Sequence, residues 1–257
     1  MTCPGCTVDS ACPSQQPLKE KVAVTSGSHG EIGVQIAREL SACGANIVIN
    51  YPSPRRQRAE AVASSLHTPS ITVEADISTI STPEGPRNLI KAAVASFGAI
   101  DILLNNVGKA VDLPFEEQTL EHWGDLVNLN GRGTFLLTQA ALPHLASRGS
   151  RIINISSISA KEGIPLQTIL SRSKAMVESF TKVWAKESPP KYNCTMNCVS
   201  PGPTRTEAFN AASADFMGVI KPLLESTPVA SRAAETSEIA YAVYMAEWGQ
   251  FGCQWGG

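Results

Sequence analysis

Residues 22–34 read Val-Ala-Val-Thr-Ser-Gly-Ser-His-Gly-Glu-Ile-Gly-Val, and this stretch decides the fold. It opens with a short β-rich apolar run, 22–25, after which apolar residues recur at helical spacing from Ile32 to Leu40 until Gly44 ends the helix. A glycine-rich turn between a strand and a helix lets backbone amides and the helix N-terminus approach a pyrophosphate. The stretch therefore predicts a strand–turn–helix unit of the kind that binds dinucleotides.

The alternation of strand and helix continues outward from this unit. Five further short apolar runs are separated by helical patterns, and they are 46–50, 71–75, 102–105, 152–156 and 194–199. Such alternation is typical of βαβ units with parallel strands. We therefore predict an α/β fold with a single Rossmann-type doubly wound parallel sheet and helices on both faces. Residues 1–18 are expected to be a flexible leader, and 19–257 the folded domain.

The bulk composition excludes several classes of protein. The 257 residues are 43% hydrophobic and 17% charged, which suits one globular α/β domain. A formal net charge of −2 gives no electrostatic basis for binding nucleic acid or an anionic membrane surface. No apolar run approaches the roughly 18 residues of a membrane span, and no secretory signal precedes the domain. We expect a cytoplasmic protein without nucleic-acid or membrane partners.

The seven cysteines do not predict a metal site. Four of them lie in segments expected to be core, where cysteine behaves as a small hydrophobe: Cys43, Cys194, Cys198 and Cys253. Cys3-Pro-Gly-Cys6, followed by Cys12, resembles half of a metal or redox motif. No second Cys/His pair lies nearby, so we interpret these thiols as incidental residues of a polar tail.

A series of motifs follows the predicted strands in order: Ser26–Gly33, Asp76-Ile77, Asn105–Gly108, Asn130–Gly133, Ser157 with Lys174, and Pro201–Thr206. Their order and spacing resemble the short-chain dehydrogenase/reductase family over nearly the whole chain. The resemblance implies cofactor contacts from the following residues: Gly27, Ser28, His29, Gly30, Ile32, Gly33, Asp76, Ile77, Asn105, Val107, Gly108, Lys174, Pro201, Gly202, Thr204 and Thr206. It also implies a catalytic set made of Ser157, Lys174 and Asn130, with Arg132 as a candidate contact to the substrate.

The end of the second strand bears on which dinucleotide is bound. It reads Asn50-Tyr51-Pro52-Ser53-Pro54-Arg55-Arg56, with Asn50 and Tyr51 at the adenine end of the site. An NAD-dependent enzyme usually places an acidic residue there to bind the ribose hydroxyls, and none is present. The adjacent serine and arginines, helped by His29, offer donors to a 2′-phosphate. This pattern favours NADP(H); the alternative is a solvated, charged start of a helix.

Glu31 stands where a gapless alignment with the family places the middle glycine of the turn. A carboxylate at a helix N-terminus stabilises the helix, but it would repel a diphosphate lying there. Either Glu31 points outward and Gly30 makes the close approach, or cofactor binding is weakened. We favour the first interpretation because Ser28, Gly30 and Gly33 remain.

Leu170 occupies the position of the family's catalytic tyrosine. The family pattern is Tyr-x-x-x-Lys, whereas this chain has Leu170-Ser171-Arg172-Ser173-Lys174, thirteen residues after Ser157. In the family the tyrosine gives or takes a proton at the substrate oxygen, and a leucine cannot. Loss of a positioned acid typically lowers a rate by about 10²–10⁴-fold. Efficient reduction of a simple ketone is therefore not expected.

Three hypotheses of function remain open. In the first, the substrate is an iminium ion, to which hydride adds without needing a proton; tyrosine-deficient relatives in fungal indole-alkaloid pathways reduce such ions, and some guide a Diels–Alder closure. In the second, the protein is a non-redox cyclase or isomerase, with the cofactor as one wall of the pocket. In the third, it is a cofactor-binding pseudoenzyme or scaffold. The first is favoured.

The segment after the Pro-Gly loop, about 207–227, is expected to form an apolar lid. Its composition suits a hydrophobic, multi-ring substrate, although a helix that merely packs on the domain is an equal alternative. Residues 161–168 are expected to form another wall of the pocket. Because the chain ends soon after Trp248, the seventh strand of the family is expected to be abbreviated, which leaves a homodimer or homotetramer open.

Overall fold

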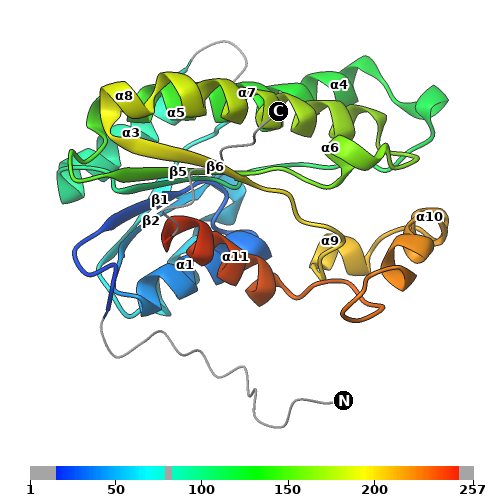
Figure 1. The fold of residues 1–257 in the computed structure, drawn as a ribbon, viewed down its shortest axis with the longest axis horizontal. Helices are drawn as coiled ribbons and strands as arrows, with labels where there is room; N and C mark the ends of the chain where they lie inside the picture. Colours follow the sequence, from blue (N-terminus) through cyan, green and yellow to red (C-terminus); the bar gives the residue numbers. More distant parts are fainter. Residues whose placement is uncertain (1–15, 79–82, 249–257) are drawn as a thin grey trace, which may run out of the picture.

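The computed structural model describes residues 16–78 and 83–248. Within these residues six parallel strands form one sheet in the order β3-β2-β1-β4-β5-β6 (Figure 1). The strands are β1 (Val22–Thr25), β2 (Asn46–Tyr51), β3 (Ser70–Glu74), β4 (Ile102–Asn105), β5 (Ser150–Ile155) and β6 (Cys194–Val199). Every neighbouring pair is parallel. The predicted doubly wound α/β fold is confirmed.

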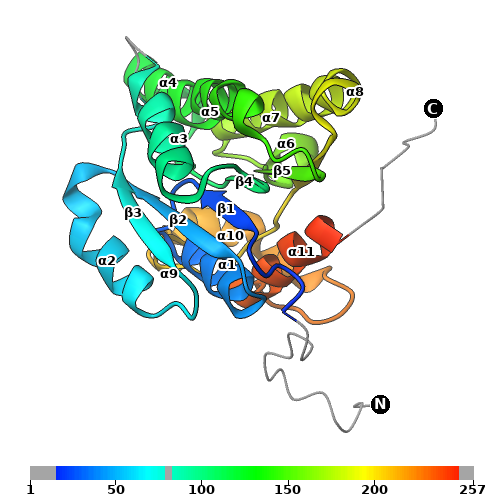
Figure 2. The same cartoon turned by 90° about the vertical axis from the view of Figure 1, so that its left-hand side faces the viewer.

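Helices cover both faces of the sheet, as Figure 2 shows from the side. One face carries α1 (Glu31–Ala42), α2 (Arg56–Ser64) and α11 (Thr236–Trp248). The other carries α3 (Glu84–Phe97), α4 (Leu120–Leu126), α5 (Thr134–Ala141), α7 (Thr168–Glu187) and α8 (Pro189–Tyr192). Each face buries its own apolar cluster, because the side chains of a strand alternate between the two faces. None of the described helices is both long and apolar enough to cross a bilayer.

Shorter elements complete the chain. The 3₁₀ turns are η1 (Ser53–Arg55), η2 (Phe115–Glu117) and η4 (Leu142–His144), and η3 (Val127–Gly133) is π-helical. The remaining helices are α6 (Ser159–Glu162), α9 (Glu207–Asn210) and α10 (Ala214–Glu225). The last two occupy the predicted lid segment and follow the carboxyl end of β6 (Figure 1).

The predicted boundaries differ from the structure in a few places. The strands β1, β4 and β6 begin and end as predicted, whereas β2 differs by one residue at its end and β3 and β5 differ by one or two residues at both ends. Leu18, assigned to the leader, is only 4% exposed, and its amide donates to the Cys43 oxygen at 2.9 Å. The domain therefore begins before residue 19, because this side chain fills the core beneath α1. The other predictions about the tails, for Cys3, Cys6, Cys12, Cys253 and the seventh strand, lie outside the described residues.

The strand order positions the functional site. β1 pairs with β2 on one side and with β4 on the other, so the chain reverses its direction of winding between β1 and β4. Ligands of doubly wound sheets bind at such a switch point, beyond the carboxyl ends of the strands. The loops after β1, β4, β5 and β6 all begin at this edge and carry the predicted motifs.

Candidate active site

A cleft of about 430 Å³ lies at the switch point. It brings together these predicted cofactor residues: Gly27, His29, Gly30, Ile32, Gly33, Arg55, Val107, Gly108 and Thr206. Arg58 was not predicted at the site, and Asn106, Glu207 and Ala208 were predicted only as members of the Asn105–Gly108 motif and of the lid segment. All four also line the cleft, as does Glu31. The cleft thus joins the glycine-rich turn, the start of α2, the loop after β4 and the start of α9.

In the glycine-rich turn, the backbone of the turn and the start of α1 lie very close together. Gly27 has φ +63°, a left-handed conformation that favours glycine, and its amide donates to Asn50 Oδ1 at 3.1 Å. A Cβ on Gly33 would lie 2.6 Å from the Gly27 oxygen, so only glycine lets α1 pack so closely on the turn. Gly30 is the N-cap of α1 and brings no side-chain cap, which leaves the first amides of the helix open to an anion.

Several predicted cofactor contacts face inward and hold the turn in place instead of lining the cleft. Ser28 is fully buried; its hydroxyl donates to the Thr25 oxygen at 2.7 Å and accepts from the Asn50 amide at 3.0 Å. Asn50 and Tyr51 are each 1% exposed. These residues determine the shape of the cleft from beneath, because the strand β2 directs them into the core.

The loop after β4 reaches the cleft through Asn106, not through Asn105. Asn105 Nδ2 donates to Thr138 Oγ1 at 2.9 Å and to Asn154 Oδ1 at 2.7 Å, beneath the sheet edge. Asn106 Nδ2 instead donates to the Ser26 oxygen at 3.0 Å and lines the cleft. The signal that could have separated the two asparagines is the alternation of side chains along a strand.

Two arginines from one helical face stand beside His29. Arg55 precedes α2, and Arg58 follows three residues later on the same face; this spacing is the signal that could have identified Arg58. Arg56 points elsewhere: its guanidinium pairs with Glu74 at 2.7 Å and lies over the Tyr51 ring. Ser53 is exposed in η1 and is not among the cleft residues.

His29 is prepared for an anion. Burial lowers the pKa of His29; the backbone of Asn50 partly offsets this, and the charges of Arg55 and Arg58 lower the pKa further. Its Nδ1 atom is buried without a hydrogen-bond partner among the described residues. A phosphate group beside these side chains would accept charge-assisted hydrogen bonds from the two arginines.

Glu31 forms part of a bridge across the mouth of the cleft. Its Oε2 atom accepts from the Glu207 amide, the first residue of α9, at 2.5 Å. The Glu207 carboxylate in turn pairs with Arg58 Nη1 at 3.2 Å. The Glu31 carboxylate is therefore directed toward the lid segment, where the N-terminus of α9 favours a negative charge.

The predicted catalytic residues lie after β5 and on α7. Ser157 follows β5, and Leu170 and Lys174 lie one turn apart on α7. Burial lowers the pKa of Lys174 to about 8, while nearby Cys198 acts in the opposite direction. Lys174 Nζ donates to the Ile155 oxygen at 2.8 Å, and a Cβ on Gly108 would lie 3.0 Å from it. The lysine therefore borders the loop that lines the cleft.

Leu170 contributes a hydrocarbon surface. It is 7% exposed and clusters with Leu126 and Ile169. A side chain in this cluster has no proton to give, and the apolar neighbours would penalise an unpaired hydroxyl.

Asn130 holds the loop after β4 against α7. Its Oδ1 accepts from the Lys109 amide at 2.9 Å, and its Nδ2 donates to the Lys109 oxygen and to Ser173 Oγ, each at 3.0 Å. All of these bonds position the backbone beside Gly108 and Lys174, so Asn130 acts as a support. Arg132 lies two residues further along the π-helical η3 and is partly buried.

The remaining predicted residues lie in two loops. Pro201 accepts from the Ile158 amide at 2.9 Å, which joins the Pro-Gly loop to the loop that carries Ser157. Thr204 Oγ1 donates to the Gly202 oxygen, and the Thr206 hydroxyl caps α9. Asp76 accepts from the amide and hydroxyl of Ser78, and Ile77 is 3% exposed.

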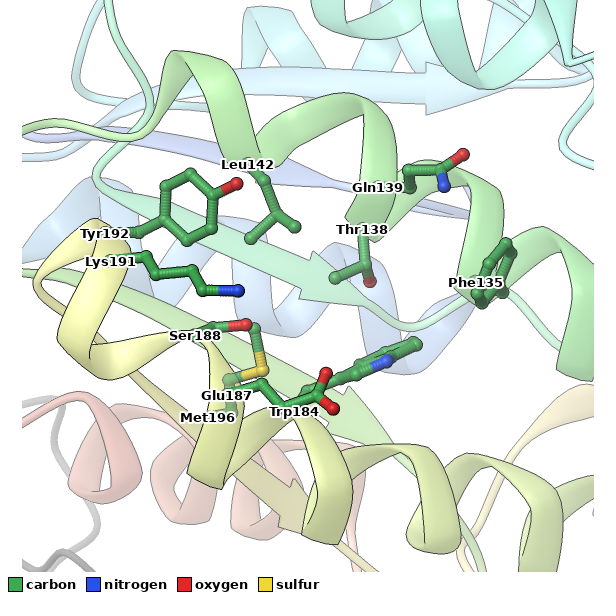
Figure 3. A pocket seen from close by; sticks show the side chains of 10 residues that line it. All are labelled: Phe135, Thr138, Gln139, Leu142, Trp184, Glu187, Ser188, Lys191, Tyr192 and Met196. Carbon is green, nitrogen blue, oxygen red and sulfur yellow. The ribbon is translucent and has the colours of Figure 1, made fainter.

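A second hollow, of about 170 Å³, lies between α5, α7 and α8, away from the predicted residues (Figure 3). Phe135 and Trp184 from its wall pack with Phe180 in an aromatic cluster. Its wall contains none of the predicted cofactor or catalytic side chains. The predicted cofactor contacts therefore gather at the larger cleft, whose lining does not include Ser157, Leu170 or Lys174.

Comparisons with known proteins agree with this geometry. The model of the family described as Enoyl-(Acyl carrier protein) reductase matches residues 27–247. The chain is 34% identical over 240 residues, 92% of each chain, to the short-chain dehydrogenase/reductase FrzI of Cladobotryum sp. It is 37% identical over 208 residues to the hydroxynaphthalene reductase-like protein Arp2 of Metarhizium anisopliae, covering 80% of this chain and 76% of the relative. A short chain dehydrogenase from Burkholderia cenocepacia J2315, solved in complex with NADP, superimposes with a TM-score of 0.80 at 28% identity, covering 90% of this chain and 91% of that chain.

Proposed function

The chain belongs to the short-chain dehydrogenase/reductase family of oxidoreductases, and on that premise we propose that it is an NADPH-dependent reductase of a hydrophobic iminium in secondary metabolism. The observation that supports the proposal is the burial of Leu170 in an apolar cluster, because we assign Leu170 to the position of the family's proton donor. Fungal relatives that include a hydroxynaphthalene reductase-like protein support a biosynthetic role.

The residues of the cleft fit NADP(H). The turn is closed tightly by Gly33, the first amides of α1 are open, and the buried His29 Nδ1 lacks a partner among the described residues. Arg55 and Arg58 add positive charge beside that atom. These groups match a pyrophosphate at the helix N-terminus and a 2′-phosphate beside α2. A related structure contains NADP, which also supports this choice.

The chain's own residues then perform the parts of the reaction that need no acid. When bound, the nicotinamide supplies hydride. Lys174, one turn from Leu170, would hold the nicotinamide ribose, and Asn130 keeps the adjoining loop in place. Hydride addition to an iminium carbon moves the π pair onto nitrogen and neutralises its charge, so no proton is required. Orientation within an apolar pocket would then supply the rate enhancement.

A non-redox cyclase is the second candidate. In this case a substrate bound beside the apolar cluster of Leu126, Ile169 and Leu170 would be held by hydrophobic contacts that bring a diene and dienophile together without any titratable group. The cofactor would then serve as part of the pocket, and substrate would be consumed without oxidation of NADPH. A scaffold role would instead predict that neither NADPH nor substrate is consumed.

Turnover of matched substrates tests the proposed reduction. We expect NADPH oxidation with 3,4-dihydroisoquinolinium at a kcat/KM at least about 100-fold above that for 1-tetralone, because only the ketone needs the missing donor. The Leu170→Tyr variant serves as the comparison and should reduce this ratio. NADPH absorbance reports the rate, and product analysis separates reduction from cyclisation. Equal rates with the two substrates would contradict the proposal.

Cofactor selectivity tests the 2′-phosphate site. The Arg58→Gln variant is expected to bind NADPH about tenfold more weakly and NADH nearly unchanged, because the lost charge lies beside the proposed 2′-phosphate site, a group that NADH lacks. Arg56→Gln is the matched control, since Arg56 pairs with Glu74 and not with the cleft. Fluorescence titration of both nucleotides gives the dissociation constants. An equal loss of affinity for both nucleotides would show that Arg58 does not contact the 2′-phosphate.

A further inference from the structure

We propose that Asp112 is a positioning residue that makes Ser157 a hydrogen-bond acceptor, so that the pocket selects a cationic substrate bearing an N–H group. The inference rests on the proposed reduction of an iminium and narrows its substrate class. It is carried by a chain of side-chain hydrogen bonds that connects the two residues through Ser159 and Gln167.

This chain of hydrogen bonds runs from the carboxyl end of β5 to the loop after β4. Ser157 Oγ donates to Ser159 Oγ at 3.1 Å, and Ser159 Oγ donates to Gln167 Oε1 at 2.5 Å. Gln167 Nε2 then donates to Asp112 Oδ1 at 2.7 Å. Ser159 and Gln167 are 5% and 6% exposed, whereas Ser157 and Asp112 at the two ends are partly exposed.

One ionised carboxylate sets the direction of every bond in this chain. A carboxylate only accepts, so the NH₂ group of Gln167 must face Asp112 and the amide oxygen must face Ser159. The amide oxygen only accepts, so the Ser159 hydroxyl proton points toward it. Ser159 Oγ is then left to accept, and the Ser157 hydroxyl proton is committed to it.

Ser157, which is partly exposed, therefore presents lone-pair density to a ligand that binds beside it. Its oxygen also accepts from the Ser159 amide at 3.2 Å, which uses one acceptor position and leaves one for a ligand. Leu170 offers no donor, and Lys174 Nζ, besides its bond to the Ile155 oxygen, is assigned to the nicotinamide ribose. A ketone oxygen would meet an acceptor here. An iminium N–H would meet a partner, and hydrogen bonds from charged donors are the stronger kind.

The surrounding backbone is built to hold Gln167 in this position. Leu166 has φ +70°, an uncommon conformation for a residue with a side chain, and its oxygen accepts from the Leu113 amide at 3.0 Å. Gln118 Nε2 donates to the oxygens of both Leu113 and Leu166, at 2.8 and 3.1 Å. Such conformations persist where the surroundings over-determine them, and they cluster at functional sites. The loop of Asp112 is thereby fastened to the residue that precedes Gln167.

Two cations that differ only at nitrogen test the assignment. The probes are protonated 1-methyl-3,4-dihydroisoquinoline, which has an N–H, and 1,2-dimethyl-3,4-dihydroisoquinolinium, which has N-methyl instead. Calorimetric titration into the full chain with NADP⁺ present measures binding without turnover. We expect the N–H cation to bind about tenfold more tightly, since it alone donates to Ser157.

Variants separate hydrogen bonding from the size of the methyl group. Asp112→Asn can offer either a carbonyl or an NH₂ group to Gln167, so the chain loses its fixed direction and the tenfold preference should fall toward unity. Ser159→Ala is a second variant, for use if Asp112→Asn fails to fold. It frees the Ser157 hydroxyl, so the tenfold preference should again fall toward unity. Glu116→Gln removes an equal charge from an exposed position in the same loop and should leave the preference unchanged.

The outcomes separate this assignment from the proposed reaction. A preference near unity in the unaltered protein, a preference that survives in both variants, or no binding of either cation would overturn the role of Asp112. Variant-dependent selectivity without NADPH oxidation would leave the assignment standing and remove the reductase. NADPH oxidation without a preference for the N–H cation would support the reductase and remove the assignment of Asp112.

Discussion

Replacing Lys174 with methionine is expected to stabilise the cofactor-free protein while abolishing its NADPH-dependent turnover. Burial lowers the pKa of Lys174 from 10.5 to about 8, so the charged side chain opposes folding at pH 7. The difference corresponds to about 3 kcal/mol. Methionine has a similar length but leaves the Ile155 oxygen without its donor, which costs about 1 kcal/mol. A net gain of about 2 kcal/mol is expected.

The pH dependence identifies the cause of this gain. Between pH 8 and 10.5 the unfolded chain holds a proton on Lys174 that the folded chain has released. The free energy of unfolding therefore rises with pH across this window in the unaltered protein. The methionine variant should lack that part of the rise. Urea unfolding at pH 7 and pH 10 measures both effects, with NADPH oxidation assayed at pH 7.

Lys182→Met is the matched control, because Lys182 lies on the same helix and is exposed. It should change neither stability nor turnover appreciably. A Lys174→Met protein that is less stable at pH 7, or that retains full turnover, would contradict the expectation. The first result would mean that the lysine is well solvated, and the second that it has no role at the cofactor.

Gly33→Ala is expected to weaken NADPH binding by about 100-fold or more, equivalent to about 3 kcal/mol. The new Cβ would lie 2.6 Å from the Gly27 oxygen and 2.8 Å from Ser28 Cα, which are backbone atoms of the turn itself. To relieve the clash the turn must move away from α1. The backbone amides that would bind the pyrophosphate then move apart. Alanine ordinarily favours a helix over glycine, so loss of binding would come from the clash alone.

Gly124→Ala is the control for this substitution. Gly124 lies on α4 and is not among the cleft residues, and its Cβ would meet only Asn128 Nδ2, at 3.8 Å. NADPH affinity should change less than about threefold, within the range of a mild packing change. Fluorescence titration of both variants, with urea unfolding to verify folding, gives the comparison. Similar NADPH affinities for the two variants would show that the close packing at Gly33 is not needed for cofactor binding.

The local elements were predictable because their signals are local. The run Val22–Thr25, the turn beginning at Gly27 and the apolar spacing of α1 each depend on residues only a few positions apart. Leu18 was missed because a single leucine in a polar tail has no periodic neighbours. Its burial depends on the space beneath α1, which no local pattern reveals.

The strand–turn–helix unit, the order of the motifs that follow the strands and the position of Leu170 one turn from Lys174 on a single helix were all predictable from local patterns. Folding was needed to place Arg58, and not Arg56, at the cleft, and to connect Asp112 with Ser157, 45 positions away, through buried side chains. This difference comes from the range of the forces involved. Backbone periodicity is set by near neighbours, whereas hydrogen-bond direction across a sheet edge is set by strand register and by loops that meet only after folding.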